Sequence, residues 1–482
     1  MAKSRRVSEI YKLGLGQGSL DFVDVDIFTD TPLFISPRAL QTLPSDWGDE
    51  CVHLVQSFFG EVLQLIKSGR NEKAEALLAE LKEPNETHLG LSVGKSQGRA
   101  LGTESAKKVW AALSRSEAAK SGLLRDLEDT ALLIEGVGVD IISDVTTNII
   151  RGPLITYTQD MAEFYGIPLE SNLAAGNIWN PVEKRWDSKV ADLPLTKEGR
   201  LLLVPKSLVR ADLQYKAADF YRHYVLTHLQ DLEFQAGSAL VRILKDGTRK
   251  PPSKKSMMEK YGTGKRAAVR ETLKHPAIMD KYRAVKDREP YKPLSSEHIA
   301  DVAKIDPPEW DALLEDVLKT PTGKASATKY EQAIDALLTA LFAPDLAFPS
   351  RQYPLHDRRK IVDLKFTNMG MSGFFHWLAV NYPAPHIWIE CKNYSGEVAN
   401  PELDQLIGRF SNARGRVGFL VCRSFDDKAR FLRRCKDTVG DGNGYILPLD
   451  DGDLKKLVEA RKGNIAYVQW PLLRDRFEKI IS

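Results

Sequence analysis

The stretch His386-Ile-Trp-Ile-Glu-Cys-Lys-Asn-Tyr394 carries the strongest signal in the chain. Its apolar and β-branched residues predict a strand over residues 387–391. Because side chains alternate between the two faces of a strand, Glu390 and Lys392 are expected to project from the same face. An acid and a base would therefore stand side by side on a sheet.

A second strand-like run, Arg359-Lys-Ile-Val-Asp-Leu-Lys-Phe366, places Asp363 27 positions before Glu390. On neighbouring strands the two carboxylates would converge on one cation. Mg²⁺ prefers oxygen ligands and keeps several waters, so these carboxylates and the backbone carbonyl of Cys391 suit it. Such an ion polarises a phosphodiester and activates water, and Lys392 would neutralise charge on the phosphate. The pattern favours metal-dependent phosphodiester hydrolysis.

The surrounding sequence predicts an α/β domain over residues 307–482, with a central mixed sheet flanked by helices. An α-β-β-α-β-α-β order is expected. The predicted helices cover residues 310–318, 327–342, 401–410 and 426–434, and the predicted strands cover residues 360–366, 387–391, 417–422 and 445–449.

These residues resemble the PD-(D/E)xK nuclease superfamily, which has the restriction-endonuclease-like fold, and within it the Mrr-type restriction endonucleases. The resemblance covers roughly residues 325–450. The family pattern has an acid on an N-terminal helix, an Asp on the second core strand, a Glu-x-Lys on the third and a polar residue on the next helix. It falls here on Glu331, Asp363, Glu390, Lys392 and Gln405.

The resemblance implies a Mg²⁺-dependent DNA endonuclease in which Mn²⁺ substitutes. Asp363, Glu390 and the Cys391 carbonyl would bind the metal, with Glu331 reaching it directly or through water. A role in defence against phage or plasmid DNA is expected from the family alone. Cutting both strands usually needs two active sites, which favours a homodimer or higher oligomer.

The chain departs from the family pattern at one position, and at two other positions a second residue could take the same role. Val362 stands where the family name has proline; Asp357 is a rival for Asp363, and Asp404 is a rival for Gln405. We prefer Asp363 because it lies inside the apolar run. A structural salt bridge between Glu390 and Lys392 is the plainest alternative reading.

Two further alternatives concern function. The nuclease fold could bind nucleic acid as a regulatory scaffold without cleaving it, or the substrate could be RNA, since a two-carboxylate metal site does not distinguish a 2′-hydroxyl. Aromatic residues 374–377 could stack on a base, but a core role is favoured. The basic residues expected to contact nucleic acid are Arg358, Arg359, Arg409, Arg414, Arg416 and Arg423.

The net charge of +3 hides a segregation of sign along the chain. Residues 241–290 contain 15 Lys and Arg against 6 Asp and Glu, and residues 351–440 contain 15 against 9. The rest of the chain is therefore acidic. Two basic blocks could form a footprint for a phosphate backbone, although solvated helix faces explain the first block equally well.

Residues 1–215 are predicted to form an α+β domain with strands over residues 21–28 and 201–206, followed by a basic helical connector over residues 216–306. No family is recognised for residues 1–320, whose role in recognition or regulation could include a protein partner. The four cysteines lack zinc spacing and indicate reduced packing residues. With no signal peptide and no long apolar stretch, a cytoplasmic protein without membrane contact is expected.

Overall fold

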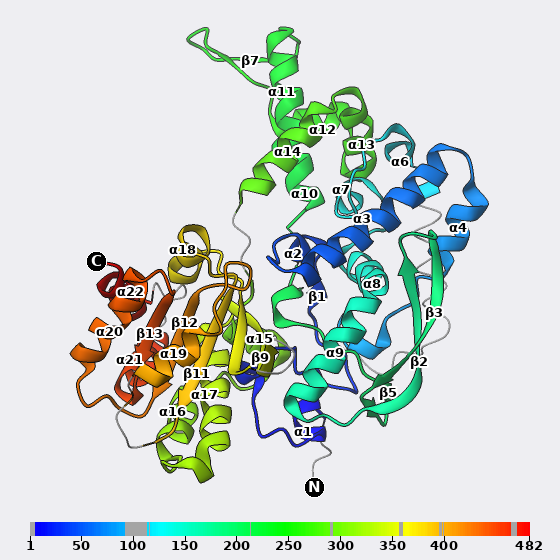
Figure 1. Cartoon of the computed structure of the whole chain (residues 1–482). Helices are drawn as coiled ribbons and strands as arrows, with labels where there is room; N and C mark the ends of the chain where they lie inside the picture. The colour runs from blue at the N-terminus through cyan, green and yellow to red at the C-terminus, as the bar shows by residue number, and fades with distance from the viewer. Residues whose placement is uncertain are drawn as a thin grey trace.

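The structure is a computed structural model that describes residues 5–482 except 92–112, 115, 213, 290–292, 356–359, 395–397, 399 and 464–469. It forms two packed bodies with separate apolar cores (Figure 1). One core gathers buried residues from Val7 to Ile299 together with Ala347 and Met369, and the other runs from Val317 to Ile480. None of the described helices is long and apolar enough to cross a membrane.

The C-terminal body contains a five-stranded mixed sheet of order β13-β12-β11-β10-β9. β9, β10 and β11 pair antiparallel, whereas β11, β12 and β13 pair parallel. Its strands are β9 (Leu346–Leu355), β10 (Lys360–Asn368), β11 (His386–Lys392), β12 (Val417–Cys422) and β13 (Tyr445–Leu449). Every residue of β12 is buried, as expected for a central parallel strand with helices on both faces.

Helices cover this sheet, so the predicted α/β class with a mixed sheet is confirmed. The helices are α16 (Trp310–Lys319), α17 (Ala327–Phe342), α18 (Gly373–Asn381), α19 (Asn400–Ile407), α20 (Lys428–Gly440), α21 (Asp451–Lys462) and α22 (Pro471–Ile481). α17 buries an apolar stripe at three- and four-residue spacing and contacts β9 and β11. The 374–377 aromatics lie in α18, where Phe374 and Phe375 are core residues.

The N-terminal body is mostly helical and carries a long exposed hairpin. Its α-helices are α1 (Val7–Ile10), α2 (Pro37–Gln41), α3 (Asp46–Lys67), α4 (Asn71–Ala79), α6 (Glu117–Ser121), α7 (Asp129–Leu133), α8 (Val139–Ile149) and α9 (Arg151–Tyr165). Its strands are β1 (Phe34–Ile35), β2 (Glu170–Asn180), β3 (Arg185–Leu193), β4 (Leu195–Thr196), β5 (Gly199–Arg200) and β6 (Val209–Arg210), and short 3₁₀ turns lie at Gln17–Ser19, Asn85–Thr87 and Lys206–Leu208.

The strands predicted over residues 21–28 and 201–206 are wrong, although the two segments do lie together. Only the pair Phe22 and Pro205 forms a β-bridge between them. Val23 still donates to the Val204 carbonyl at 2.9 Å. The alternation in the sequence does not correspond to alternating burial, because every residue over 20–25 is buried. The carboxylates of Asp21 and Asp24 accept hydrogen bonds from the hydroxyls of Tyr157 and Ser8.

Residues 217–303 form helices that pack into the N-terminal core. They are α10 (Ala217–Asp219), a π-helical turn (Phe220–Val225), α11 (Leu226–Gln235), α12 (Lys254–Tyr261), α13 (Gly264–Lys274), α14 (Ala277–Arg288) and α15 (Ser296–Ala303), with the hairpin β7 (Arg242–Ile243) and β8 (Arg249–Lys250) between α11 and α12. Tyr282 and Met279 are fully buried there. Most of the segment that the sequence assigns to a connector is thus an integral part of the larger body.

The two bodies meet along β9, the edge strand of the sheet. Phe348 adopts a φ of 52°, which is unusual for a bulky residue, and its amide donates to the Asp21 carboxylate at 3.1 Å. Its ring lies 5.6 Å from that of Trp47 and 5.7 Å from that of Tyr157. The N-terminal body therefore covers an edge that would otherwise be open to strand pairing.

Candidate active site on the five-stranded sheet

Asp363 and Glu390 face each other across the antiparallel pair β10 and β11. The register pairs Leu364 with Ile389, so Asp363 is opposite Glu390 at the next position. Residues directly opposite each other in an antiparallel pair project from the same face, with Cβ atoms about 4.5–5.5 Å apart. The structure thus brings together the two carboxylates that the sequence placed 27 positions apart.

Lys392 lies two residues beyond Glu390 and joins the acidic pair to α19. Its Nζ donates to Glu390 Oε1 at 2.8 Å and to Gln405 Oε1 at 3.0 Å. The rival at the helix position, Asp404, is exposed. One lysine therefore links the strand acid to the helix amide, and Gln405, not Asp404, makes this contact.

Burial sets the electrostatics of the pair. Glu390 is 1% exposed, and burial together with the neighbouring Asp363 charge raises its pKa. Burial also raises the pKa of Asp363, against the lowering effects of the Cys391 amide, which donates to Asp363 Oδ2 at 2.8 Å, and of the Lys392 and Arg409 charges. Two ionised carboxylates at this position repel each other unless a cation joins them.

One oxygen of the pair has no partner among the described residues. Glu390 Oε2 is buried and makes no hydrogen bond to any of them, while Oε1 accepts from Lys392. A buried unsatisfied carboxylate oxygen is costly, and native structures rarely retain one without a reason. Its position beside Asp363 fits a divalent cation that takes the two carboxylates and fills the rest of its shell with water and phosphate oxygens.

Glu331 is half-buried on α17 and lies near the same strand. The pKa of the Cys391 thiol is raised well above its usual range, first by burial and then by the charges of Asp363, Glu331 and Glu390. The three carboxylates therefore lie near Cys391. Among the described residues, however, no group of three or more His, Cys, Asp or Glu side chains has the geometry of a metal cage.

The predicted nucleic-acid-binding arginines are placed in different environments. Arg409 is buried and lowers the pKa of both site carboxylates, so it lies within the site. Arg423 donates to the Val317 and Leu318 carbonyls and forms an ion pair with Asp451. These contacts attach α16 to the sheet, so Arg423 has a structural role. Arg358 and Arg359 lie outside the described residues.

Arg414 and Arg416 precede β12, whose Val417 pairs with Ile387 at the start of β11. Lys392 pairs with Cys422 at the other end of the same two strands. Five residues of strand span about 16 Å. The structure thus places these two arginines at the sheet end opposite the Lys392 side chain.

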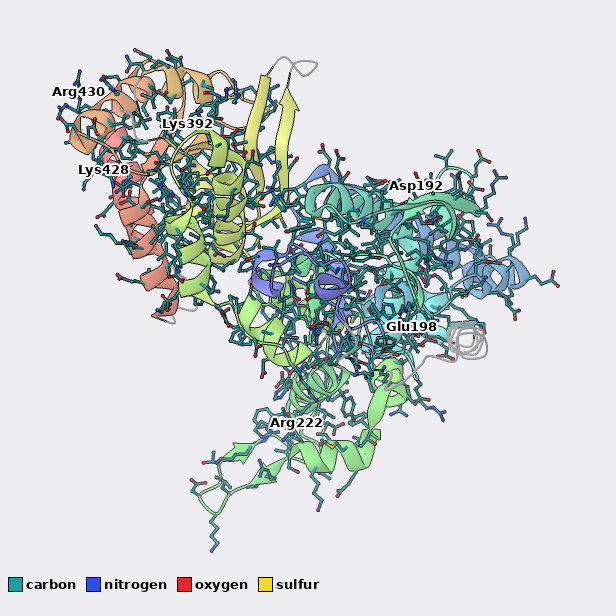
Figure 2. All side chains as sticks on the ribbon, turned by 90° about the horizontal axis from the view of Figure 1, so that it is seen from below. Asp192, Glu198, Arg222, Lys392, Lys428 and Arg430 are labelled. Carbon is teal, nitrogen blue, oxygen red and sulfur yellow. The ribbon has the colours of Figure 1, made fainter. Side chains whose placement is uncertain are left out.

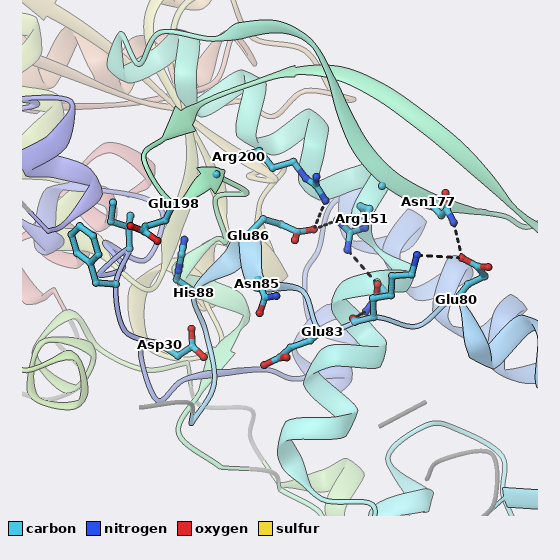
Figure 3. A pocket seen from close by; sticks show the side chains of 16 residues that line it. Asp30, Glu80, Glu83, Asn85, Glu86, His88, Arg151, Asn177, Glu198 and Arg200 are labelled. Atoms are coloured by element: carbon cyan, nitrogen blue, oxygen red, sulfur yellow. Dashed lines mark hydrogen bonds and ion pairs between the residues drawn. The ribbon is translucent and has the colours of Figure 1, made fainter. Parts of the chain in front are cut away.

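A cavity of about 530 Å³ lies in the N-terminal body, and none of the residues that line it belongs to the site on the sheet (Figure 3). Its buried Arg151 pairs with Glu86 and also donates to Asn148 Oδ1 at 3.2 Å. Arg200 lies 3.8 Å from the same Glu86 carboxylate. The sequence offered no motif for this cavity, because its residues come from five separate segments of the chain.

Comparisons with known proteins add one match. Residues 12–216 match the family model of a domain of unknown function, DUF8370. No curated protein matches the chain. No solved structure matches it either.

Proposed function

We propose that this chain is a Mg²⁺-dependent endonuclease that hydrolyses DNA phosphodiester bonds at Asp363, Glu390 and Lys392, on a restriction-endonuclease-like domain. The observation that carries the proposal is the convergence of these residues. The buried carboxylate of Glu390 and the half-buried carboxylate of Asp363 share one face of neighbouring strands, and a lysine bridges Glu390 to the next helix. Defence against foreign DNA is the biological role that we infer for such an enzyme.

The carboxylates of the site would bind the metal ion. Asp363 and Glu390 would hold Mg²⁺, which supplies Lewis-acid polarisation of the phosphodiester and lowers the pKa of an attacking water. Lys392 binds Glu390 Oε1, so Glu390 Oε2 and the Asp363 carboxylate are the oxygens that would bind the metal. The Cys391 carbonyl and Glu331 would complete the protein's share of the ligands.

Lys392 would act on the substrate side of the site. Its ammonium is held by two acceptors from different elements, and its side chain is 14% exposed. It therefore reaches solvent at one edge while remaining fixed. A fixed cation at that edge stabilises the charge that builds on the phosphate oxygens in the transition state, and it orients the nucleophilic water.

A purely structural salt bridge explains less of this arrangement. A structural pair would not place a second carboxylate directly opposite the first. The cost of such repulsion is typical of a site that binds a cation.

The test is cleavage of supercoiled plasmid, linear duplex, single-stranded DNA and RNA by the purified full chain. Each substrate is incubated with Mg²⁺, Mn²⁺ or a chelator. The proposal predicts nicked and linear plasmid with either metal and intact plasmid with chelator. Cleavage of RNA alone would correct the substrate class, and metal-independent cleavage would contradict the proposal.

A scaffold that binds nucleic acid without cutting it predicts a different outcome. No substrate would be cut with either metal, and Glu390→Gln would leave the biological activity of the chain unchanged. Loss of that activity in Glu390→Gln, with retained DNA binding, supports the enzyme.

A further inference from the structure

The basic block over residues 241–290 separates in the structure into two groups of cations. Six of the nine cations on the body of the helical segment form ion pairs with carboxylates. These ion pairs are Lys260 with Glu233, Arg266 with Glu135, Arg270 and Lys274 with Glu271, Arg283 with Asp129, and Lys286 with Glu289. This part of the block therefore serves folding.

The second group lies on a projection that we call the basic arm, residues 236–255, which extends from the end of α11 through the β7–β8 hairpin to the first turn of α12. Figure 1 shows the hairpin standing away from both bodies. The arm contains six cations and one acid, Asp246. Asp246 is occupied in the hairpin turn, where its carboxylate accepts the Thr248 amide at 2.9 Å.

The arm is held in shape by its own contacts. The Arg249 guanidinium donates to the Phe234 carbonyl at 3.1 Å and lies over the Phe234 ring. Arg242 Nε donates to the Pro251 carbonyl at 3.2 Å. The amide of Leu244 donates to the Thr248 carbonyl at 2.9 Å, which closes the hairpin. The projection is thus a formed β-ribbon and not a loose loop.

The four lysines of the arm do not take part in the contacts that hold the hairpin. Lys245, Lys250, Lys254 and Lys255 form no ion pair with a described carboxylate, in contrast to Lys260, Lys274 and Lys286 of the neighbouring body. The Lys254 ammonium lies 3.5 Å from His223 Nδ1, and Arg222 is exposed beside that histidine (Figure 2). The positive charge of the arm is therefore presented to solvent.

Two of these lysines stand where a cation weakens the fold. Lys254 and Lys255 are the first two residues of α12, after the N-cap Ser253, and the first turn contains no acid. The positive end of the helix dipole disfavours cations at these positions. Fold stability alone does not explain two lysines in the first turn of α12, whereas binding of a negatively charged ligand does.

We propose that the basic arm binds the phosphate backbone of duplex DNA, as a contact separate from the cleavage site. The major groove of B-DNA admits a two-stranded β-ribbon, and lysines on both sides of such a ribbon reach the flanking phosphates. Ile243 and Leu244 on the same ribbon are 72% and 39% exposed, and they supply apolar contacts to thymine methyl groups or to a base step. The choice of DNA over other polyanions rests on the proposed nuclease function.

The experiment measures binding of the full chain to a fluorescent duplex of about 40 base pairs in chelator, where cleavage plays no part, over a range of salt concentrations. The arm variant carries Lys245→Gln, Lys250→Gln, Lys254→Gln and Lys255→Gln. A control variant carries Lys73→Gln, Lys189→Gln, Lys197→Gln and Lys479→Gln, four exposed lysines outside the arm. The two variants have the same net charge.

Loss of four phosphate contacts should lower the slope of log affinity against log salt by about 3 to 4 and weaken binding at least about tenfold. The control variant should bind like the wild type. The arm variant should also melt no earlier than the wild type, because Lys254→Gln and Lys255→Gln relieve the first turn of α12. Weak binding then cannot be attributed to unfolding.

Equal affinity and equal salt slope in the arm variant and the wild type would overturn the proposal. Equal weakening in both variants would also overturn it, because net charge and not the arm would then be responsible. If the chain bound single-stranded RNA more tightly than the duplex, and this binding depended on the arm, the partner of the arm would be RNA and the proposal of duplex DNA would be wrong. A failure of the nuclease proposal is distinguishable, since it abolishes cleavage while leaving these binding results as stated.

Discussion

Replacement of Lys392 by methionine tests the electrostatics of the candidate site. The change replaces the lysine with an unbranched apolar side chain that is one heavy atom shorter, and it removes the ammonium. Glu390 is 1% exposed and its Oε1 accepts from Lys392 at 2.8 Å, while Oε2 has no partner in the part of the chain that the structure describes. The substitution therefore leaves both oxygens of a buried carboxylate unsatisfied, directly opposite Asp363.

Breaking a buried ion pair by removal of one partner typically costs about 3–5 kcal/mol, and both side chains here are well under one third exposed. The cost should be largest at neutral pH. It should shrink as the pH falls, because an isolated Glu390 takes up a proton and is then neutral. The double variant Glu390→Gln with Lys392→Met should recover most of the lost stability, since it leaves no buried charge.

The assay is urea unfolding of the full chain in chelator, at neutral and at mildly acidic pH, for the wild type, Lys392→Met and the double variant. Lys479→Met on the exposed face of α22 is the control for loss of a lysine. A cost under about 1 kcal/mol, or one that does not change with pH, would refute the reasoning, because Lys392 would then be an ordinary surface lysine.

Four more outcomes follow from the structure. Cleavage should decline as the pH falls through the raised pKa values of Asp363 and Glu390, because their protonated forms release Mg²⁺; a flat acid limb in a pH–rate profile would contradict this. Because the folded-state pKa of Glu390 lies above its usual range, its ionisation destabilises the folded chain, so in chelator the urea midpoint of the wild type should fall relative to that of Glu390→Gln with Lys392→Met as the pH rises from the usual carboxyl range to neutral; a difference that does not change with pH would count against the shift. Arg423→Ala should destabilise the chain by about 1–3 kcal/mol, because two buried carbonyls lose their donor, with little change in cleavage per folded molecule; a selective loss of DNA affinity would instead indicate a phosphate contact. Phe348→Ala should cost roughly 2 kcal/mol in thermal unfolding through lost packing on Trp47 and Tyr157, and a neutral effect would show that the two bodies dock without this contact.

The sequence predicts the C-terminal sheet where the hydrophobic pattern is strong and local. The strands 387–391, 417–422 and 445–449 are apolar runs between turn residues, and the structure has β11, β12 and β13 there. β9 was missed, because Pro349 and Pro354 interrupt its pattern. An edge strand tolerates proline, since one side of it makes no ladder hydrogen bonds, and β9 pairs only with β10.

The helix α18 was missed for a different reason. Residues 373–381 are so apolar and aromatic that no helical period appears in the sequence. The helix contacts α22 and β10 and buries Phe374, Phe375 and Leu378, whereas its equally apolar Val380 is 67% exposed. Only the tertiary packing distinguishes it from a bend between strands.

Within the candidate site, the sequence identifies residue types and spacing but not which neighbours meet. Strand alternation predicts that Glu390 and Lys392 share a face, and the pairing of β10 with β11 then brings in Asp363. The choice of Gln405 over Asp404 depends on the rotation of α19, which one sequence does not fix. Arg409 was expected to face phosphate, and its nearness to both carboxylates depends on burial that no local pattern reports.

For the basic block over residues 241–290, too, the sequence does not show which side chains meet. Its charge count is visible in the sequence, but the partners of Arg283 and Lys260 lie 154 and 27 residues away. Only the fold separates cations that stabilise it from those of the arm.

The central claim is that Asp363, Glu390 and Lys392 form a metal-dependent cleavage site. The most direct test is the rate at which the full chain nicks supercoiled plasmid in Mg²⁺, measured for the wild type, Lys392→Ala and the control Lys479→Ala at equal concentrations of folded protein. The account predicts Mg²⁺-dependent nicking by the wild type and the control, and a rate lower by a factor of about 10² to 10³ in Lys392→Ala. Equal rates for Lys392→Ala and the wild type would contradict it.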